Sequence, residues 1–416
     1  DALAAALNWT VAEMHSEGLS VRKVPATLPS WIRGEEAASL LLPNRVQPLT
    51  ILGLPGSVPT NGTLEADVLY LRSFGELNAS RDRGEVVGKI VVFDHPFVND
   101  YMTAARYRWA SAGPVAAAGG VAVLSRSVTR RSLNTPHTGA MDYDDDGGIQ
   151  RIPAAALTIE DSTLIGRLSQ RGIPLRVRLR LSSTEGPAVS SYNIVAEVPG
   201  AEQLRRGTNE TQDQNIVLLA AHMDSWDQGS GAVDDAAGCI VMWEALRLIH
   251  AFPIRPRNTV RLVLFVGEER GQAGAHAYAE RVARGEEGQI SLAIESDDGT
   301  LSLDGWNINT IPQPPSPHLV SHMTRILELL APLSHNASRL DISEDTGADT
   351  YMLGQHGAVL MMPRGEGGHD GVIDYFDMHH APSDTPDKLV PAALGQFTAG
   401  IATLAYAAAD MRDWQF

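Results

Sequence analysis

The sequence has 416 residues, of which 44% are hydrophobic and 20% charged, as is typical of a globular protein. At this length we expect two domains. The formal net charge of -17 argues against nucleic acid as a partner and disfavours anionic membrane surfaces. No apolar run approaches the roughly 20 residues that span a bilayer, so we expect no membrane span.

Cysteine content and glycosylation motifs bear on the compartment. Cys239 is the single cysteine, so no internal disulfide is possible. The acceptor motif Asn-x-Ser/Thr occurs at Asn8, Asn61, Asn78, Asn209 and Asn336. These motifs favour a secreted or lysosomal glycoprotein, and a bacterial periplasmic protein with accidental motifs is the alternative.

The N-terminal half is predicted to contain one helix and then a β-rich region. Apolar residues at helical spacing predict a helix over residues 2–17. Short β-rich runs separated by Gly and Pro turns follow, at 66–71, 89–93, 120–124, 152–158 and 175–181. We therefore predict a mostly β domain over residues 49–189, inserted into a larger domain formed by residues 1–48 and 190–416.

The C-terminal half alternates between strands and helices. Compact apolar runs, typical of strands buried on both faces, occur at 216–220, 260–266, 291–294 and 358–361. Helical stretches lie between or after them, at 235–249, 318–330 and 392–408. This alternation predicts an α/β domain with a largely parallel sheet.

Each of these apolar runs is followed by imidazole or carboxylate groups. In chain order they are His222 and Asp224 with Asp234 and Asp235, then Glu268 and Glu269, then Glu295 and Asp297, and finally His379 and His380. Any one of these motifs is more often structural than functional. The carboxyl ends of parallel strands meet at one edge of a sheet, however, so we expect these groups to converge. Zinc accepts imidazole nitrogen and carboxylate oxygen, and the set predicts a site for two divalent metals.

The same motifs resemble the co-catalytic zinc aminopeptidase and glutamate carboxypeptidase superfamily. The resemblance is carried by His222-x-Asp224, Gly231-Ala-x-Asp-Asp235, Glu268-Glu269, Glu295-Ser-Asp297 and a late histidine before x-x-x-Asp384-Thr385. It implies two Zn²⁺ ions per chain. His222 and Asp297 would hold one ion, Glu269 and His380 the other, and Asp234 would bridge them.

The resemblance also implies roles for residues beside the metals. Glu268 would be the general base, and the Asp224 side chain would hydrogen-bond the far nitrogen of His222 and fix its tautomer. His380 is preferred to His379 as the ligand, because the family pattern places three residues between the ligand and Asp384. His379 would then line the cleft. Asp349 would lie near the substrate, with a charge at a helix N-terminus as the alternative.

The implied activity is that of a metallo-exopeptidase acting on small unblocked peptides, most simply dipeptides. Alternatives are an aminopeptidase for longer peptides, a one-zinc glutaminyl cyclase on a similar sheet, and a non-catalytic binding protein with the same fold. The inserted region resembles a protease-associated domain, which would wall the cleft or merely stabilise the fold. Family members dimerise, so a homodimer is expected, and the amphipathic stretch at 318–330 is a candidate interface.

Overall fold

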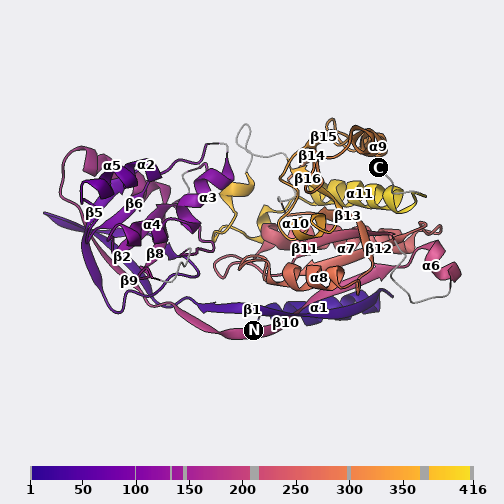
Figure 1. The fold of residues 1–416 in the computed structure, drawn as a ribbon, viewed down its shortest axis with the longest axis horizontal. Coiled ribbons are helices and arrows are strands. Elements are labelled where there is room, and N and C mark those ends of the chain that lie inside the picture. Colours follow the sequence, from indigo (N-terminus) through magenta and orange to yellow (C-terminus); the bar gives the residue numbers. More distant parts are fainter. Residues whose placement is uncertain are drawn as a thin grey trace.

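The computed structural model describes residues 2–98, 100–131, 134–143, 148–206, 215–297, 301–365 and 374–412. Two eight-stranded sheets organise these residues, and Figure 1 shows them at opposite ends of an elongated molecule. We call the sheets with their helices the first-sheet unit and the second-sheet unit. The predicted α/β class is therefore confirmed, with two mixed sheets. The sequon at Asn209 lies outside the described residues.

The first sheet contains the strands expected from the C-terminal half. In spatial order it consists of β1 (Ser20–Ile32), β10 (Thr184–Val198), β12 (Thr259–Phe265), β11 (Asn215–His222), β13 (Gln289–Glu295), β16 (Val359–Gly365), β14 (Leu303–Asn309) and β15 (Leu340–Ile342). The four strands from β12 to β16 are parallel, whereas β1 with β10, β10 with β12 and β14 with β16 pair antiparallel, and the edge pair β14–β15 is parallel again. The predicted largely parallel sheet is thus correct at the centre, and antiparallel pairs on both sides of the centre make the sheet as a whole mixed. Much of β1 and β10 is exposed, so these strands lack a compact apolar run.

Helices cover both faces of the first sheet. One face packs against α1 (Ala2–Ser16), α7 (Ala237–Ala251), α9 (Pro317–Leu327) and α11 (Pro391–Ala409), and the other against α8 (Ala273–Ala283) and α10 (Tyr351–Gly354). Successive β11 residues alternate between these cores, with Val217 on one face and Leu218 on the other. A short helix, α6 (Ala201–Arg206), follows β10.

Two of these helices bear on earlier expectations. Helix α9 buries its apolar residues Leu319, Met323 and Leu327 in its own core, so they form no exposed dimer face. The homodimer stays a prediction. Helix α11 is long and apolar enough to span a bilayer, contrary to the sequence estimate. Half of its most apolar stretch is buried, and it packs against α7 and β11 as a core helix does.

The second sheet is an α/β layer of its own. Its strands in spatial order are β3 (Arg45–Leu49), β2 (Glu36–Leu42), β9 (Arg176–Leu181), β5 (Leu64–Leu71), β6 (Ile90–Phe93), β7 (Ala122–Arg126), β8 (Ala154–Leu157) and β4 (Ile51–Gly53). Four helices accompany them: α2 (Phe74–Asp82), α3 (Tyr101–Trp109), α4 (Ala112–Ala117) and α5 (Ile159–Gln170). The prediction of a mostly β region missed these helices because they are short, with 6 to 12 residues each. The sheet also begins at Glu36, before residue 49.

A buried carboxylate ties three elements of the first-sheet unit together. The Glu287 side chain is fully buried and forms ion pairs with Arg22 on β1, Arg261 on β12 and Arg281 on α8. Arg281 Nε lies 2.7 Å from the carboxylate, and Arg261 is itself only 1% exposed. Burial opposes the charge, but Arg22 and Arg281 hold the pKa of Glu287 below its usual value. The network leaves each buried charge compensated.

Replacing Glu287 with glutamine is expected to lower the free energy of unfolding by about 1.5–3 kcal/mol, because buried Arg261 loses one of its two carboxylate partners and keeps only Glu197. Chemical denaturation measures the change. The matched control is Glu286→Gln, since Glu286 is exposed and its pairs with Arg281 and Arg284 are solvated. That control should change stability by less than about 1 kcal/mol. Equal effects of the two substitutions would show that the buried network contributes no special stability.

Candidate metal centre

The groups expected to converge do meet at the carboxyl ends of the parallel strands. His222 is the last residue of β11, Glu268 and Glu269 follow β12, and Asp297 follows β13. Because β12, β11 and β13 are parallel neighbours, their ends place these side chains at one edge of the sheet. His380 comes after β16 and closes the cluster from the other side.

Asp234 lies between two histidines, and each of its oxygens faces one of them. Its Oδ1 is 3.3 Å from His222 Nε2, and its Oδ2 is 3.5 Å from His380 Nε2. His222 Nε2 is also 3.4 Å from Asp297 Oδ1, and His380 Nε2 is 3.1 Å from Glu269 Oε2. The arrangement therefore contains two sets of one imidazole and one carboxylate, with a shared carboxylate between them.

The chemistry of this cluster fits divalent cations. His222 Nε2, Glu269 Oε1 and Asp297 Oδ1 are buried without a hydrogen-bond partner among the described residues. Buried polar atoms without partners are costly, and a metal ion would satisfy them. Burial opposes protonation of His222, but the carboxylates of Asp297 and Asp234 raise its pKa well above the usual value. The same surplus of negative charge would attract a cation.

The cluster offers alternatives at two positions. Potential ligand groups also include Asp235 with His222 and Asp297, and His379 with Asp234 and His380. The Asp235 carboxylate, however, already accepts hydrogen bonds from the backbone N–H groups of His222 and Gly238, at 3.2 and 3.0 Å. His379 Nε2 lies 3.9 Å from Asp234, farther than His380 does, and its ring stacks on that of His380. The geometry thus favours Asp234 over Asp235 and His380 over His379 as metal ligands.

A turn before α7 holds Asp234 in place. The sequence predicts a helix from residue 235, but α7 begins at Ala237, because Asp234 and Asp235 have non-helical backbone angles. The Asp384 carboxylate accepts hydrogen bonds from the N–H groups of Val233 and Asp234, at 2.7 and 3.3 Å. Asp384 therefore positions the shared carboxylate, a role that its sequence motif alone does not reveal.

The prediction for the Asp224 side chain is wrong in its contact. His222 Nδ1 lies 2.9 Å from the backbone carbonyl of Asp224, not from its carboxylate. The carboxylate instead accepts hydrogen bonds from the N–H groups of Gly267, Glu268 and Glu269. The carbonyl at position 224 still selects the tautomer of His222 that leaves Nε2 free to bind metal. The side chain orients the loop that carries the two glutamates.

The two adjacent glutamates have different surroundings. Glu269 is 7% exposed and contacts His380, whereas Glu268 is partly exposed and belongs to none of the potential ligand groups in the described residues. Burial raises the pKa of Glu268 to about 7, and the nearby carboxylates of Asp224 and Asp234 add to the shift. A carboxylate with this pKa is suited to accepting and returning a proton near neutral pH.

Sequence reasoning assigned no residue of the second-sheet unit a contact with this site. His137 Nδ1 lies 2.7 Å from the carbonyl of His379, and the N–H of Thr138 donates to the carbonyl of His380 at 2.9 Å. Tyr101, on α3, packs edge-on against the His379 ring. Figure 1 shows α3 beside the chain segment that precedes α11. The motif Pro136-His-Thr-Gly139 was the available signal, although its spacing gives no hint of its partners.

Asp349 is buried near the cluster. It is 1% exposed, and neither carboxylate oxygen has a hydrogen-bond partner among the described residues. Its own N–H and that of Thr350 donate to the Glu295 carboxylate at 3.1 and 2.7 Å. Burial raises the pKa of Asp349 well above its usual value, with the carboxylates of Glu295 and Glu268 adding to the effect.

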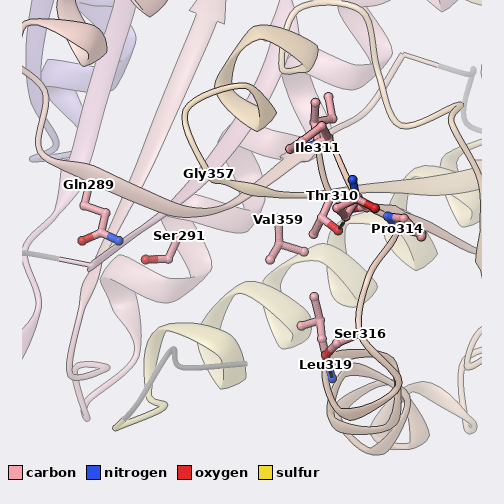
Figure 2. A pocket seen from close by; sticks show the side chains of 11 residues that line it. Gln289, Ser291, Thr310, Ile311, Pro314, Ser316, Leu319, Gly357 and Val359 are labelled. Atoms are coloured by element: carbon pink, nitrogen blue, oxygen red, sulfur yellow. Dashed lines mark hydrogen bonds between the residues drawn. The ribbon is translucent and has the colours of Figure 1, made fainter.

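A separate cavity of about 360 Å³ lies at the opposite end of the first sheet (Figure 2). Gln289 and Val359, the first residues of β13 and β16, line it together with the proline-rich segment 310–316. Its lining consists of amide, hydroxyl and apolar groups without carboxylate or imidazole side chains. The cavity therefore lies apart from the metal-binding chemistry.

Comparison with known proteins identifies the family. The sequence model of Peptidase family M28 matches residues 193–405, which is more than half of the chain and includes the whole cluster. The chain belongs to peptidase family M28. This M28 peptidase is 37% identical to carboxypeptidase Q of Xenopus laevis over 392 residues, which is 94% of this chain and 77% of that protein. It is 35% identical to carboxypeptidase Q of Homo sapiens over 406 residues, or 96% of this chain and 79% of that protein.

Solved structures agree with this assignment. The M28 peptidase superposes on a Peptidase M28 precursor from Shewanella amazonensis SB2B with a TM-score of 0.85 at 30% identity, covering 99% of this chain and 89% of that one. A zinc aminopeptidase from Bacillus subtilis superposes with a TM-score of 0.66 at 18% identity, covering 97% of this chain and 88% of that one. At this identity the likeness shows the fold alone. The predicted family is confirmed. The chain is a co-catalytic zinc peptidase and a carboxypeptidase Q homologue, with a candidate ligand cluster for its metal ions.

Proposed function

We propose that this M28 peptidase is an exopeptidase that hydrolyses small unblocked peptides, with dipeptides as its main substrates. The observation that carries the proposal is the shared carboxylate of Asp234 between two imidazole–carboxylate pairs, with Glu268 beside them and outside the ligand groups. Similarity to carboxypeptidase Q over most of the chain supports an exopeptidase. The dipeptide preference is an inference from that similarity.

The distances support the ligand assignment that the family resemblance implies. His222 and Asp297 would hold one Zn²⁺, Glu269 and His380 would hold the other, and Asp234 would be a ligand to both. Bound zinc lowers the pKa of water and polarises the scissile carbonyl. The protein contributes buried ligands with fixed orientation, because backbone groups hold the Nδ1 atoms of both histidines.

Glu268 performs the proton transfers in this proposal. Its carboxylate accepts a proton from the attacking water and passes it to the amine that leaves. A pKa of about 7 in the metal-free protein suits both steps, since the group can be charged or neutral near physiological pH. Asp349 and His379 lie nearby and are proposed to line the substrate cleft.

We also propose that the second-sheet unit is the protease-associated domain suggested by the sequence, and that it walls the cleft. Its contacts with His379 and His380 through His137, Thr138 and Tyr101 support this role. A wall on this side of the metal centre would restrict the length of the bound peptide. Short substrates are the expected consequence.

The test combines metal content with a peptide panel on the purified protein. The expected result is two zinc ions per chain and cleavage of unblocked dipeptides, with slower cleavage of tripeptides and none of dipeptides blocked at either end. Stepwise removal of N-terminal residues from long peptides would instead indicate an aminopeptidase. Pyroglutamate formation from a peptide with N-terminal glutamine would indicate a cyclase. Bound metal without turnover of any peptide would indicate a non-catalytic binding protein.

A further inference from the structure

His380 has an unusual backbone conformation, and residues of the second-sheet unit contact it. Its φ angle is 60°, in the left-handed region that residues other than glycine rarely occupy. Such a conformation costs about 1–3 kcal/mol and persists when surrounding contacts enforce it. Here the N–H of Thr138 donates to the His380 carbonyl at 2.9 Å, and the Thr138 carbonyl lies 3.2 Å from His380 Nδ1. Thr138 thus contacts both the backbone and the ring of His380.

Arg108 on α3 lies beside this contact and reaches both of its partners. It is 7% exposed, its Nη1 donates to the Thr138 carbonyl at 3.2 Å, and the same nitrogen is 3.3 Å from His380 Nδ1. Its Nη2 donates to the Tyr101 hydroxyl at 2.9 Å. A Cβ atom at Gly139 would lie 2.4 Å from the guanidinium carbon, so only glycine admits Arg108 at this depth. Among the described residues, Arg108 has no carboxylate partner.

A buried arginine without a carboxylate partner is costly for stability, so its position suggests a use. Histidine binds a metal through Nε2 when Nδ1 carries a proton and donates it to an acceptor. The acceptor for His380 is the Thr138 carbonyl, and Arg108 donates to the same carbonyl from a position beside the imidazole. Arginine can only donate hydrogen bonds, so it cannot replace the carbonyl as acceptor. Its role is to fix where the carbonyl lies.

We propose that Arg108 is a positioning residue for the metal ligand His380, through which the second-sheet unit sets the affinity of the Glu269–His380 side of the metal centre. The inference rests on the proposed ligand assignment. Loss of a group that orients a metal ligand typically lowers metal affinity by about 10–100-fold. The second-sheet unit would then do more than wall the cleft, because the metal centre would be incomplete without it.

The experiment measures zinc binding to the metal-free full-length protein by competition with a chelator at constant pH. Arg108→Met is expected to lower the affinity for one of the two zinc ions by about 10–100-fold and to leave the affinity for the other unchanged. Tyr101→Phe removes only the hydroxyl that accepts a hydrogen bond from Arg108, so it should lower the affinity for the same ion to a smaller extent. The matched control is Arg106→Met on the same helix, because Arg106 is exposed and its guanidinium lies over the Phe74 ring. Arg106→Met should bind both ions as the wild type does.

A double-mutant cycle with His380→Ala separates positioning from a general loss of stability. If Arg108 acts through His380, Arg108→Met causes no further loss of zinc affinity in the His380→Ala background. The proposal would be overturned if the two substitutions lowered zinc affinity additively, or if Arg108→Met lowered the affinity for both ions equally. If Arg108→Met prevents folding, Tyr101→Phe takes its place in the cycle. If the wild type binds two zinc ions and the variants bind them with unchanged affinity, this inference alone is refuted. If the wild type binds no zinc, the proposed function is refuted as well.

Discussion

Replacing Glu268 with glutamine is expected to lower kcat on a dipeptide by about 10²–10⁴-fold while both zinc ions stay bound. Glutamine has the size of glutamate but cannot accept the proton of the attacking water. Glu268 is outside the potential ligand groups of the described residues, so its loss should leave metal content unchanged. Steady-state kinetics and metal analysis of the same preparation measure both quantities.

Two comparisons make the Glu268 result specific. Glu280→Gln is the control, because the Glu280 side chain is 74% exposed on α8, and its kinetics should match those of wild type. Loss of one zinc ion from the Glu268 variant would instead mean that Glu268 is a ligand. Unchanged kcat with both ions retained would remove Glu268 from the mechanism.

The pH profile of the wild type gives an independent test of the same role. The proposed base must be deprotonated, so kcat/KM should fall as pH decreases through the pKa of Glu268. That pKa is about 7 without metal, and two nearby cations favour the carboxylate and move it lower. The acid limb should therefore lie below pH 7, with roughly a tenfold loss per pH unit. The residual activity of Glu268→Gln should lack this limb.

The metal cluster could be predicted because its information is local in the sequence. His222, Glu269 and Asp297 each lie within a few residues of a compact apolar run, and parallel strands bring such positions to one edge of a sheet. The strand ends therefore determine which side chains meet. The antiparallel β1–β10 ribbon and the short helices α2–α5 carry no comparable signal, since their apolar faces are narrow or interrupted.

The remaining features of the site depend on contacts between distant segments or on side-chain orientation. Arg108 and His380 are 272 positions apart, and no sequence period links them. The hydrogen bonds of Asp224 depend on how its loop turns, which decides whether the carbonyl or the carboxylate reaches His222. The choice between Asp234 and Asp235 is of the same kind, because neighbouring residues in a turn point in different directions.

Substitution of Asp234 with asparagine is expected to release both zinc ions and abolish peptide hydrolysis. Each carboxylate oxygen of Asp234 faces a different histidine, so one side chain serves both metal positions. An amide has the same shape but lacks the negative charge that offsets repulsion between two adjacent cations. The loss of zinc affinity should exceed the roughly 10–100-fold effect of losing a supporting hydrogen bond. Chelator competition and metal analysis measure it.

Asp235→Asn is the matched comparison, because it changes the adjacent carboxylate of the same turn. Asp235 accepts hydrogen bonds from His222 and Gly238, so its substitution should lower the unfolding free energy by about 1–3 kcal/mol and leave two zinc ions bound. If Asp235→Asn lost zinc and Asp234→Asn retained it, the roles of the two aspartates would be exchanged. Loss of only one ion from Asp234→Asn would assign Asp234 to a single metal. Release of both ions from that variant alone would establish a shared ligand, since each Asp234 oxygen faces a different histidine.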